Sequence, residues 1–174
     1  VEESPYPRSK YEAEKAAWEF MGMNYKKLSF DLVVLNPVGI FGPVLIPVKD
    51  ENEVNLSNQL VLKVLNSAYP GYANIGYHGI DVRDLAVLHV RAAVTPEANG
   101  RYICANGEFC SMAQVASLMI DAIPALGPVL VPPTRVLPNA LIIVGAVFDP
   151  VVSIKAARRM LNNGAPKLSN NKCN

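Results

Sequence analysis

The chain has 174 residues, enough for one domain with a sizeable hydrophobic core. Hydrophobic residues make up 51% of it and charged residues 18%, a composition that excludes an intrinsically disordered chain. The net charge is +1 and no basic block occurs, so we expect no nucleic-acid partner and no membrane partner. The three cysteines lack the spacing of metal ligands, which indicates reduced thiols of a cytoplasmic protein and no metal site.

The first stretch predicts an amphipathic helix over residues 7–23. Pro7 suits the first helical position, where a missing N–H costs nothing. Small and apolar residues recur with helical spacing along one face, and charged residues fill the other. The apolar face holds Ala13, Ala16, Ala17, Phe20 and Met21, and the charged face Glu12, Glu14, Lys15 and Glu19. A sequence that starts with Val1-Glu2-Glu3 does not fit a signal peptide, and without an initiator Met we expect it to be part of a longer protein.

Tyr6 and Lys10 stand one helical turn apart and so share a helix face. A free tyrosine has a pKa of about 10, and lowering it by about 3 pH units takes about 4 kcal/mol. A cation at ~4 Å supplies about that much at an effective dielectric constant of ~20. The pair therefore has the chemistry of an acid/base catalyst, although the same spacing also occurs where an aromatic ring and a cation merely share a face.

Residues 30–35 form a nearly continuous apolar run, typical of a buried strand in a parallel sheet. The run stops at Asn36-Pro37, and a loop rich in Gly and Pro follows to Pro43. Ligands of α/β proteins bind where parallel strands end in such loops. An ordinary turn would leave the same pattern.

The rest of the chain alternates helices and short strands. We expect helices over 57–67, from 81 to about 94, over 112–123 and over 153–161, strands at 75–80 and 101–105, a short buried helix at 141–148 and a loose tail at 165–174. Asp81 and Asp84 suit caps and ion pairs of a helix better than metal ligands, and Ser111 suits an N-cap. The alternation favours an α/β fold.

Four blocks in order resemble the extended short-chain dehydrogenase/reductases, nearest to the dihydroflavonol-4-reductase-like branch of aldehyde and ketone reductases. The first is Tyr6-Pro-Arg-Ser-Lys10 with Ala13-Glu-Lys-Ala-Ala-Trp18. The others are Leu35-Asn-Pro-Val38 through Phe41-Gly-Pro43, Asp81-Val-Arg-Asp-Leu-Ala86 with His89, and Ser153 to Leu161. Together they span nearly the whole chain.

This resemblance implies NADP(H)-dependent reduction of a small-molecule aldehyde or ketone to an alcohol, with NAD as the other possible cofactor. Tyr6 would donate a proton to the carbonyl oxygen, and Lys10 would hydrogen-bond the nicotinamide ribose. Pro37 and Val38 match positions whose backbone lies against the nicotinamide, and Ser57 matches a serine near the cofactor. Members of the family often form homodimers through the helix at residues 7–23.

The implied fold is the C-terminal part of a Rossmann-type doubly wound parallel sheet with a small mixed substrate-binding lobe. Residues 1–43 would end the cofactor-binding domain and 44–174 would form mainly the substrate lobe, with 81–105 returning to the sheet. The glycine-rich turn that holds the pyrophosphate does not occur in the sequence, and neither does an earlier catalytic Ser or Thr. We therefore expect the chain alone to bind dinucleotide poorly and to be inactive.

Two alternatives stay open. One is a sugar-nucleotide epimerase or a 3β-hydroxysteroid-type dehydrogenase of the same fold, although no cluster of Arg residues for a diphosphate stands out. The other is a non-catalytic regulatory or scaffold protein that retains the fold.

Overall fold

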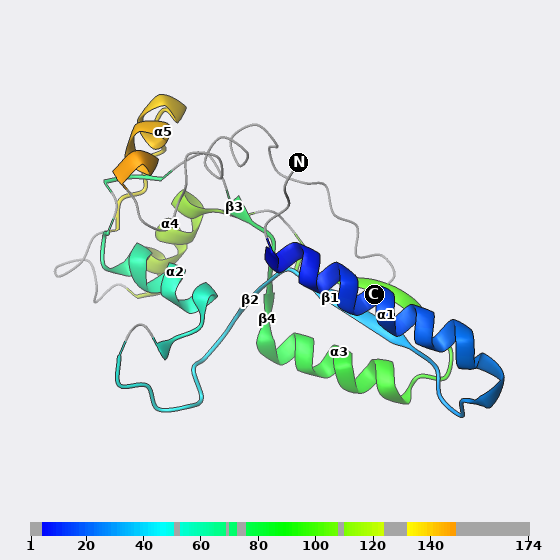
Figure 1. Cartoon of the computed structure of the whole chain (residues 1–174). Coiled ribbons are helices and arrows are strands. Elements are labelled where there is room, and N and C mark those ends of the chain that lie inside the picture. Colours follow the sequence, from blue (N-terminus) through cyan, green and yellow to red (C-terminus); the bar gives the residue numbers. More distant parts are fainter. Residues whose placement is uncertain are drawn as a thin grey trace.

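The computed structural model describes residues 5–50, 53–68, 70–72, 76–107, 110–123 and 132–148 (Figure 1). Its α-helices are α1 (Pro5–Asn24), α2 (Leu56–Leu65), α3 (Val82–Val94), α4 (Met112–Ala122) and α5 (Asn139–Phe148), and η1 (Tyr25–Lys27) is a short 3-10 helix after α1. The strands are β1 (Val33–Pro37), β2 (Gly39–Phe41), β3 (Gly76–Tyr77), β4 (Gly79–Asp81), β5 (Gly100–Cys104) and β6 (Cys110–Ser111).

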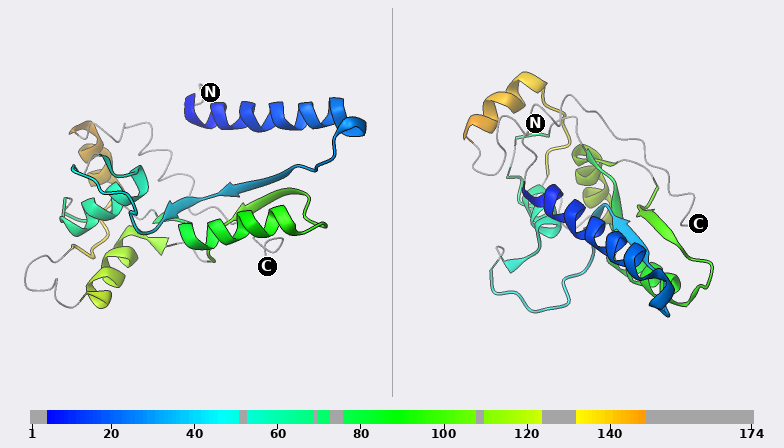
Figure 2. Two further views of the ribbon diagram at one scale, coloured as in Figure 1. Left: turned by 90° about the horizontal axis from the view of Figure 1, so that it is seen from below. Right: turned by 45° about the vertical axis from the view of Figure 1, so that its right-hand side comes forward.

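β1 and β5 form a parallel ribbon between two helical layers. Their register runs from Val33 opposite Gly100 to Pro37 opposite Cys104. Figure 2 shows α1 on one side of this ribbon and α3 on the other. Parallel neighbours need a long crossover connection, and here β2, α2, β4 and α3 lie within it. β2 pairs in parallel with β4, and this short pair is a separate two-stranded sheet.

The side of the ribbon that faces α3 is a packed core. Ile80, Leu85 and Cys104 are buried together there, and Leu35 and Tyr102 pack against them. Leu35 and Tyr102 are also opposite one another in the strand register, so they project to the same face. This core fixes α3 and β4 against β1 and β5.

A second core lies between α2 and α4. Val64, Tyr72, Met112 and Ala116 are its buried residues. α4 begins with a capping box in which the Ser111 side chain accepts from the N–H of Gln114 and the Gln114 side chain accepts from the N–H of Ser111. The predicted N-cap at Ser111 is therefore confirmed.

The predicted helices and strands within the described residues are present, with shifted ends. α1 begins at Pro5 rather than Pro7, and β1 spans 33–37 rather than 30–35. The strand expected at 75–80 is divided into β3 and β4, which pair with different partners. The helix expected at 153–161 and the tail at 165–174 lie outside the described residues.

No residue of α1 is fully buried. On its apolar face Phe20 is 53% exposed, whereas Ala17 and Met21 are half-buried. The dimer contact implied by the resemblance would use this face and stays a prediction. In the part of α5 whose side chains the structure describes, the expected burial is not seen, since Leu141 and Val144 are each 56% exposed. In the part of the chain that the structure describes, no helix combines the length and apolar character needed to cross a membrane.

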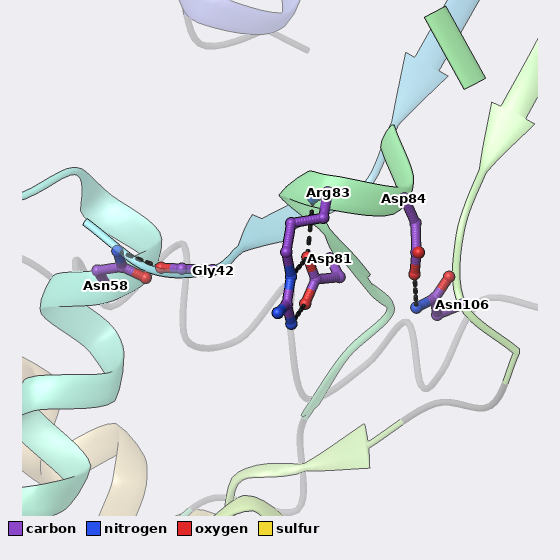
Figure 3. A network of polar contacts seen from close by, with 6 residues as sticks. All are labelled: Gly42, Asn58, Asp81, Arg83, Asp84 and Asn106. Atoms are coloured by element: carbon purple, nitrogen blue, oxygen red, sulfur yellow. Dashed lines mark hydrogen bonds and ion pairs between the residues drawn. The ribbon is translucent and has the colours of Figure 1, made fainter. Parts of the chain in front are cut away.

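α3 begins at an aspartate cap, as predicted. The Asp81 carboxylate accepts hydrogen bonds from the Arg83 backbone N–H at 2.8 Å and from the Arg83 guanidinium at 2.6 and 2.9 Å (Figure 3). The Arg83 side chain first, and then its backbone N–H, lower the pKa of Asp81 from 3.8 to about 2. Asp84, in the first turn of α3, accepts from the Asn106 side chain at 3.2 Å.

Gly76→Ala tests the close approach of β3 and β6. A Cβ on Gly76 would lie 2.1 Å from the Cys110 carbonyl oxygen, which is backbone and cannot swing aside. We expect the substitution to lower the unfolding free energy by about 1–3 kcal/mol in chemical denaturation. Gly22→Ala is the matched control, because a Cβ there meets nothing within 4 Å and the residue lies in α1. It should be neutral or stabilising, by up to about 1 kcal/mol, and an equal loss in both variants would contradict this packing.

Asp81→Asn tests the cap by its pH dependence. Because the folded-state pKa of Asp81 lies below its ordinary value, the carboxylate's contribution is complete above pH 3.8 and is lost as the pH falls through about 2. Asparagine still caps a helix but does not titrate. Unfolding measured from neutral pH downward should therefore show a smaller acid-induced loss of stability in the variant. Superimposable pH profiles would contradict the role of Asp81.

Candidate functional site

The Tyr6 and Lys10 side chains lie together in the first half of α1. The Lys10 ammonium is 5.4 Å from the centroid of the Tyr6 ring, a cation–π distance, and Tyr6 is 70% exposed. α1 runs antiparallel to β1, so its first turns lie toward the carboxyl end of that strand (Figure 2). The two side chains of the predicted pair are thus in contact with each other.

α1 holds a second Tyr and Lys pair with the same spacing, Tyr11 and Lys15, which the sequence argument overlooked. Tyr11 is also exposed, at 65%, but Lys15 is directed to Glu19, with 3.7 Å between Nζ and Oε1. Tyr11 lies about 7.5 Å further along the helix and about 140° around it from Tyr6. Tyr6 and Lys10 differ from Tyr11 and Lys15 in two ways. They lie nearer the start of the helix, and the Lys10 ammonium has no ion pair among the described residues.

Pro37 and Val38 occupy the carboxyl end of the ribbon. Pro37 ends β1 and is exposed, and Val38 donates its N–H to the Cys104 carbonyl oxygen at 3.2 Å. The Val38 side chain packs against the core beneath α3. The backbone at Pro37 and Val38 is therefore held in place by its hydrogen bond to β5 and by the core packing of Val38. Such a rigid backbone suits one wall of a ligand site.

Ser57 lies in the first turn of α2, directly after the N-cap Asn55 and Leu56. Its neighbour Asn58 donates its side-chain N–H to the Gly42 carbonyl oxygen at 3.0 Å (Figure 3). This bond ties the start of α2 to the turn that follows β2. Gly42 is required there, because a Cβ would lie 2.4 Å from Val82 Cγ1.

An open pocket of about 430 Å³ lies beyond the end of β2. Its described walls are residues 40–48 and 53–55 with Asn58 and Val82, and most of them are apolar. Val44, Leu45 and Ile46 on its rim are exposed, Leu45 to 87%. Asn58 lines this pocket, whereas Ser57 is not among its described lining residues.

The described contacts join Tyr6 to Lys10, but no hydrogen bond or ion pair among the described residues joins either to Pro37, Val38 or Ser57. The described residues also hold no group of three or more His, Cys, Asp or Glu side chains arranged for a metal ion.

The sequence pattern placed Glu14 on the charged outer face of the helix, but in the structure its carboxylate has two partners. It accepts hydrogen bonds from Arg101 on β5, at 2.5 Å from Nε and 3.2 Å from Nη2. Trp18 Nε1 also donates to Glu14, at 3.1 Å. Arg101 first, and then Trp18, hold the pKa of Glu14 below its ordinary value. Helical periodicity cannot reveal a partner 87 residues away.

No known family profile matches the chain. It is 42% identical over 101 residues to cinnamoyl-CoA reductase 1 of Petunia hybrida, a match that covers 58% of this chain and 28% of that protein. It is 32% identical over 122 residues to the NADPH-dependent methylglyoxal reductase of Saccharomyces cerevisiae, covering 70% of this chain and 36% of the relative. The chain thus spans about a third of the length of these curated relatives.

The structure is similar to the crystal structure of a yeast methylglyoxal/isovaleraldehyde reductase in complex with NADPH, with a TM-score of 0.58 and 25% identity. That likeness covers 90% of this chain and 48% of the yeast chain. It confirms the predicted α/β fold of Rossmann type. The resemblance drawn from the sequence blocks is confirmed as a similarity to part of such reductases: the chain matches segments of a cinnamoyl-CoA reductase and a methylglyoxal reductase that make up about a third of their length.

Proposed function

We propose that the chain carries the nicotinamide side of an NADPH-dependent reductase site that converts an aldehyde or ketone to an alcohol. The observation that carries this proposal is the exposed contact between Tyr6 and Lys10 near the carboxyl end of β1. Ligands of α/β folds bind at that end of the sheet. The relatives named above are reductases, and one of them is NADPH-dependent, which supports NADP over NAD.

Tyr6 is the proton donor in this proposal. A nicotinamide bound here would supply the hydride for the carbonyl carbon, and the Tyr6 hydroxyl would give its proton to the carbonyl oxygen. The phenolate that remains carries a negative charge, which the neighbouring Lys10 ammonium stabilises. Lys10 also supplies N–H donors that suit the ribose hydroxyls of the nicotinamide half.

The described residues fit the nicotinamide half of the cofactor better than its phosphates. Pro37 and Val38 offer a fixed backbone wall, and Ser57 offers an uncharged hydroxyl in the first turn of α2. No glycine-rich turn for the pyrophosphate occurs in the sequence. The apolar pocket beyond β2 suits the uncharged part of a small carbonyl substrate.

The missing pyrophosphate turn predicts weak cofactor binding by this chain. In a calorimetric titration with NADPH we expect no saturation at micromolar concentrations, because the phosphates gain no backbone cradle. The NADPH-dependent methylglyoxal reductase of Saccharomyces cerevisiae serves as the positive control. Micromolar binding by the chain would show that the phosphate-binding part is not needed.

Tyr6→Phe tests the proton donor in a chimera in which this chain replaces the matching part of the yeast reductase. The substitution should lower turnover of an aldehyde by at least ~100-fold, since a positioned acid contributes on the order of 10²–10⁴. Stability should change little, because Tyr6 is 70% exposed. NADPH consumption measures the rate, and cofactor binding confirms that each chimera is folded.

Tyr11→Phe is the matched control, with the same spacing to a lysine on the same helix. It should leave turnover within about twofold, because Lys15 is directed to Glu19 and the pair lies further from the end of the ribbon. Equal losses in the two variants would refute the assignment to Tyr6, and an unchanged rate in Tyr6→Phe would refute the catalytic mechanism itself.

A further inference from the structure

α1 carries the two proposed reacting groups but packs only partly on the rest of the fold. Ala17, Trp18 and Met21 are half-buried, whereas Tyr6 and Met23 are more than half exposed and no residue of the helix is fully buried. The opposite side of the ribbon differs, because α3 covers a closed apolar core. Partial packing of this kind leaves the orientation of α1 on β1 and β5 to be set by a more directional contact.

Glu14 is the point at which α1 is tied to the ribbon. Its carboxylate takes both Nε and Nη2 of Arg101, and the Trp18 indole donates to the same carboxylate. We call Glu14, Trp18 and Arg101 the clasp. A two-point guanidinium contact fixes direction as well as distance, so it restricts rotation of the helix about its own axis.

The clasp lies in one row with the proposed reacting groups. Tyr6, Lys10, Glu14 and Trp18 follow each other at intervals of four residues, so they form a continuous ridge along α1. Rotating the helix at Glu14 would turn Lys10 and Tyr6 with it. The C-terminal end of α1 is joined to β1 through η1, whereas the clasp is the described polar contact that ties the middle of the helix to β5.

We propose that the clasp, chiefly through Glu14 and Arg101, sets the orientation of α1. In this orientation Tyr6 and Lys10 both face the carboxyl end of the ribbon. This proposal rests on the function proposed above only for its effect on turnover. Glu14 and Arg101 are positioning residues, since they touch neither Tyr6 nor Lys10. Their effect reaches the site through the orientation of α1.

The clasp differs from an ordinary surface ion pair in its geometry. The Glu14 side chain is only 19% exposed and accepts from two residues, and its partner lies 87 residues away in sequence. Lys15 and Glu19, by contrast, are about half exposed, 3.7 Å apart and within a single helix. The second pair cannot orient α1, which makes Glu19→Gln a matched control for Glu14→Gln.

Hydrogen exchange and the fluorescence of Trp18, the sole tryptophan, test the clasp in the full chain without reference to activity. In Glu14→Gln, amides of residues 5–24 should exchange roughly two- to fivefold faster while those of α3 and β5 stay unchanged. The Trp18 emission should move to longer wavelength, because the weaker contact of residue 14 with Arg101 lets the helix move and exposes the indole to water. Glu19→Gln should change neither quantity. Unchanged exchange and emission in Glu14→Gln, or equal changes in Glu19→Gln, would overturn the proposal.

Two further experiments distinguish an effect on the orientation of α1 from a general loss of stability. One exchanges the charges of residues 14 and 101, and the other measures enzyme kinetics. The double variant Glu14→Arg with Arg101→Glu should recover part of the protection that Glu14→Arg loses alone. In the chimera, Glu14→Gln should lower kcat several-fold and leave KM for NADPH within about twofold, whereas a purely structural role would leave kcat unchanged in the folded fraction. If Tyr6→Phe retains its rate, the proposed function fails, and the exchange data still decide whether the clasp orients α1.

Discussion

The parallel pairing of β1 with β5 is the constraint on which the other features depend. It joins residues 33–37 to residues 100–104 and brings their carboxyl ends to the same edge. Pro37 and Val38 are fixed there by the contact with Cys104, and Arg101 is placed on the side where α1 lies. Both the proposed cofactor wall and the clasp follow from this one register, so a slip by one residue would turn Arg101 to the other face.

The two faces of the ribbon are stabilised by different physical effects. On the α3 side, burial of Ile80, Leu85 and Cys104 supplies non-directional apolar stabilisation. On the α1 side, the main described contact is a directional ion pair between Glu14 and the exposed guanidinium of Arg101. An ion pair of this kind contributes little to stability but specifies orientation well. This difference fits the proposed role of α1, which is to present Tyr6 and Lys10 rather than to close a core.

Local signals in the sequence predicted most of the elements, because caps and periodicity act over a few residues. The Ser111 and Asp81 caps and the helix around Tyr6 follow from such signals. Three features did not follow from them: the partner of Glu14, the division of the expected strand at 75–80, and the exposure of α5. Each depends on what lies across the fold, and an apolar pattern such as that of α5 predicts a tendency to be buried without supplying the surface that buries it. The contact between Tyr6 and Lys10 was predicted from spacing, whereas spacing alone could not separate it from Tyr11 and Lys15.

The proposal that this chain holds the nicotinamide half of a reductase site can be tested by nuclear magnetic resonance of the full chain. The chain is titrated with reduced nicotinamide mononucleotide and separately with adenosine 2′,5′-bisphosphate. The mononucleotide needs no pyrophosphate cradle, so it should shift the signals of residues 6–10 and 37–38 at millimolar concentration, while the adenosine compound should leave them unchanged. Shifts confined to other residues, or equal shifts with both compounds, would show that residues 6–10 and 37–38 do not bind the nicotinamide half.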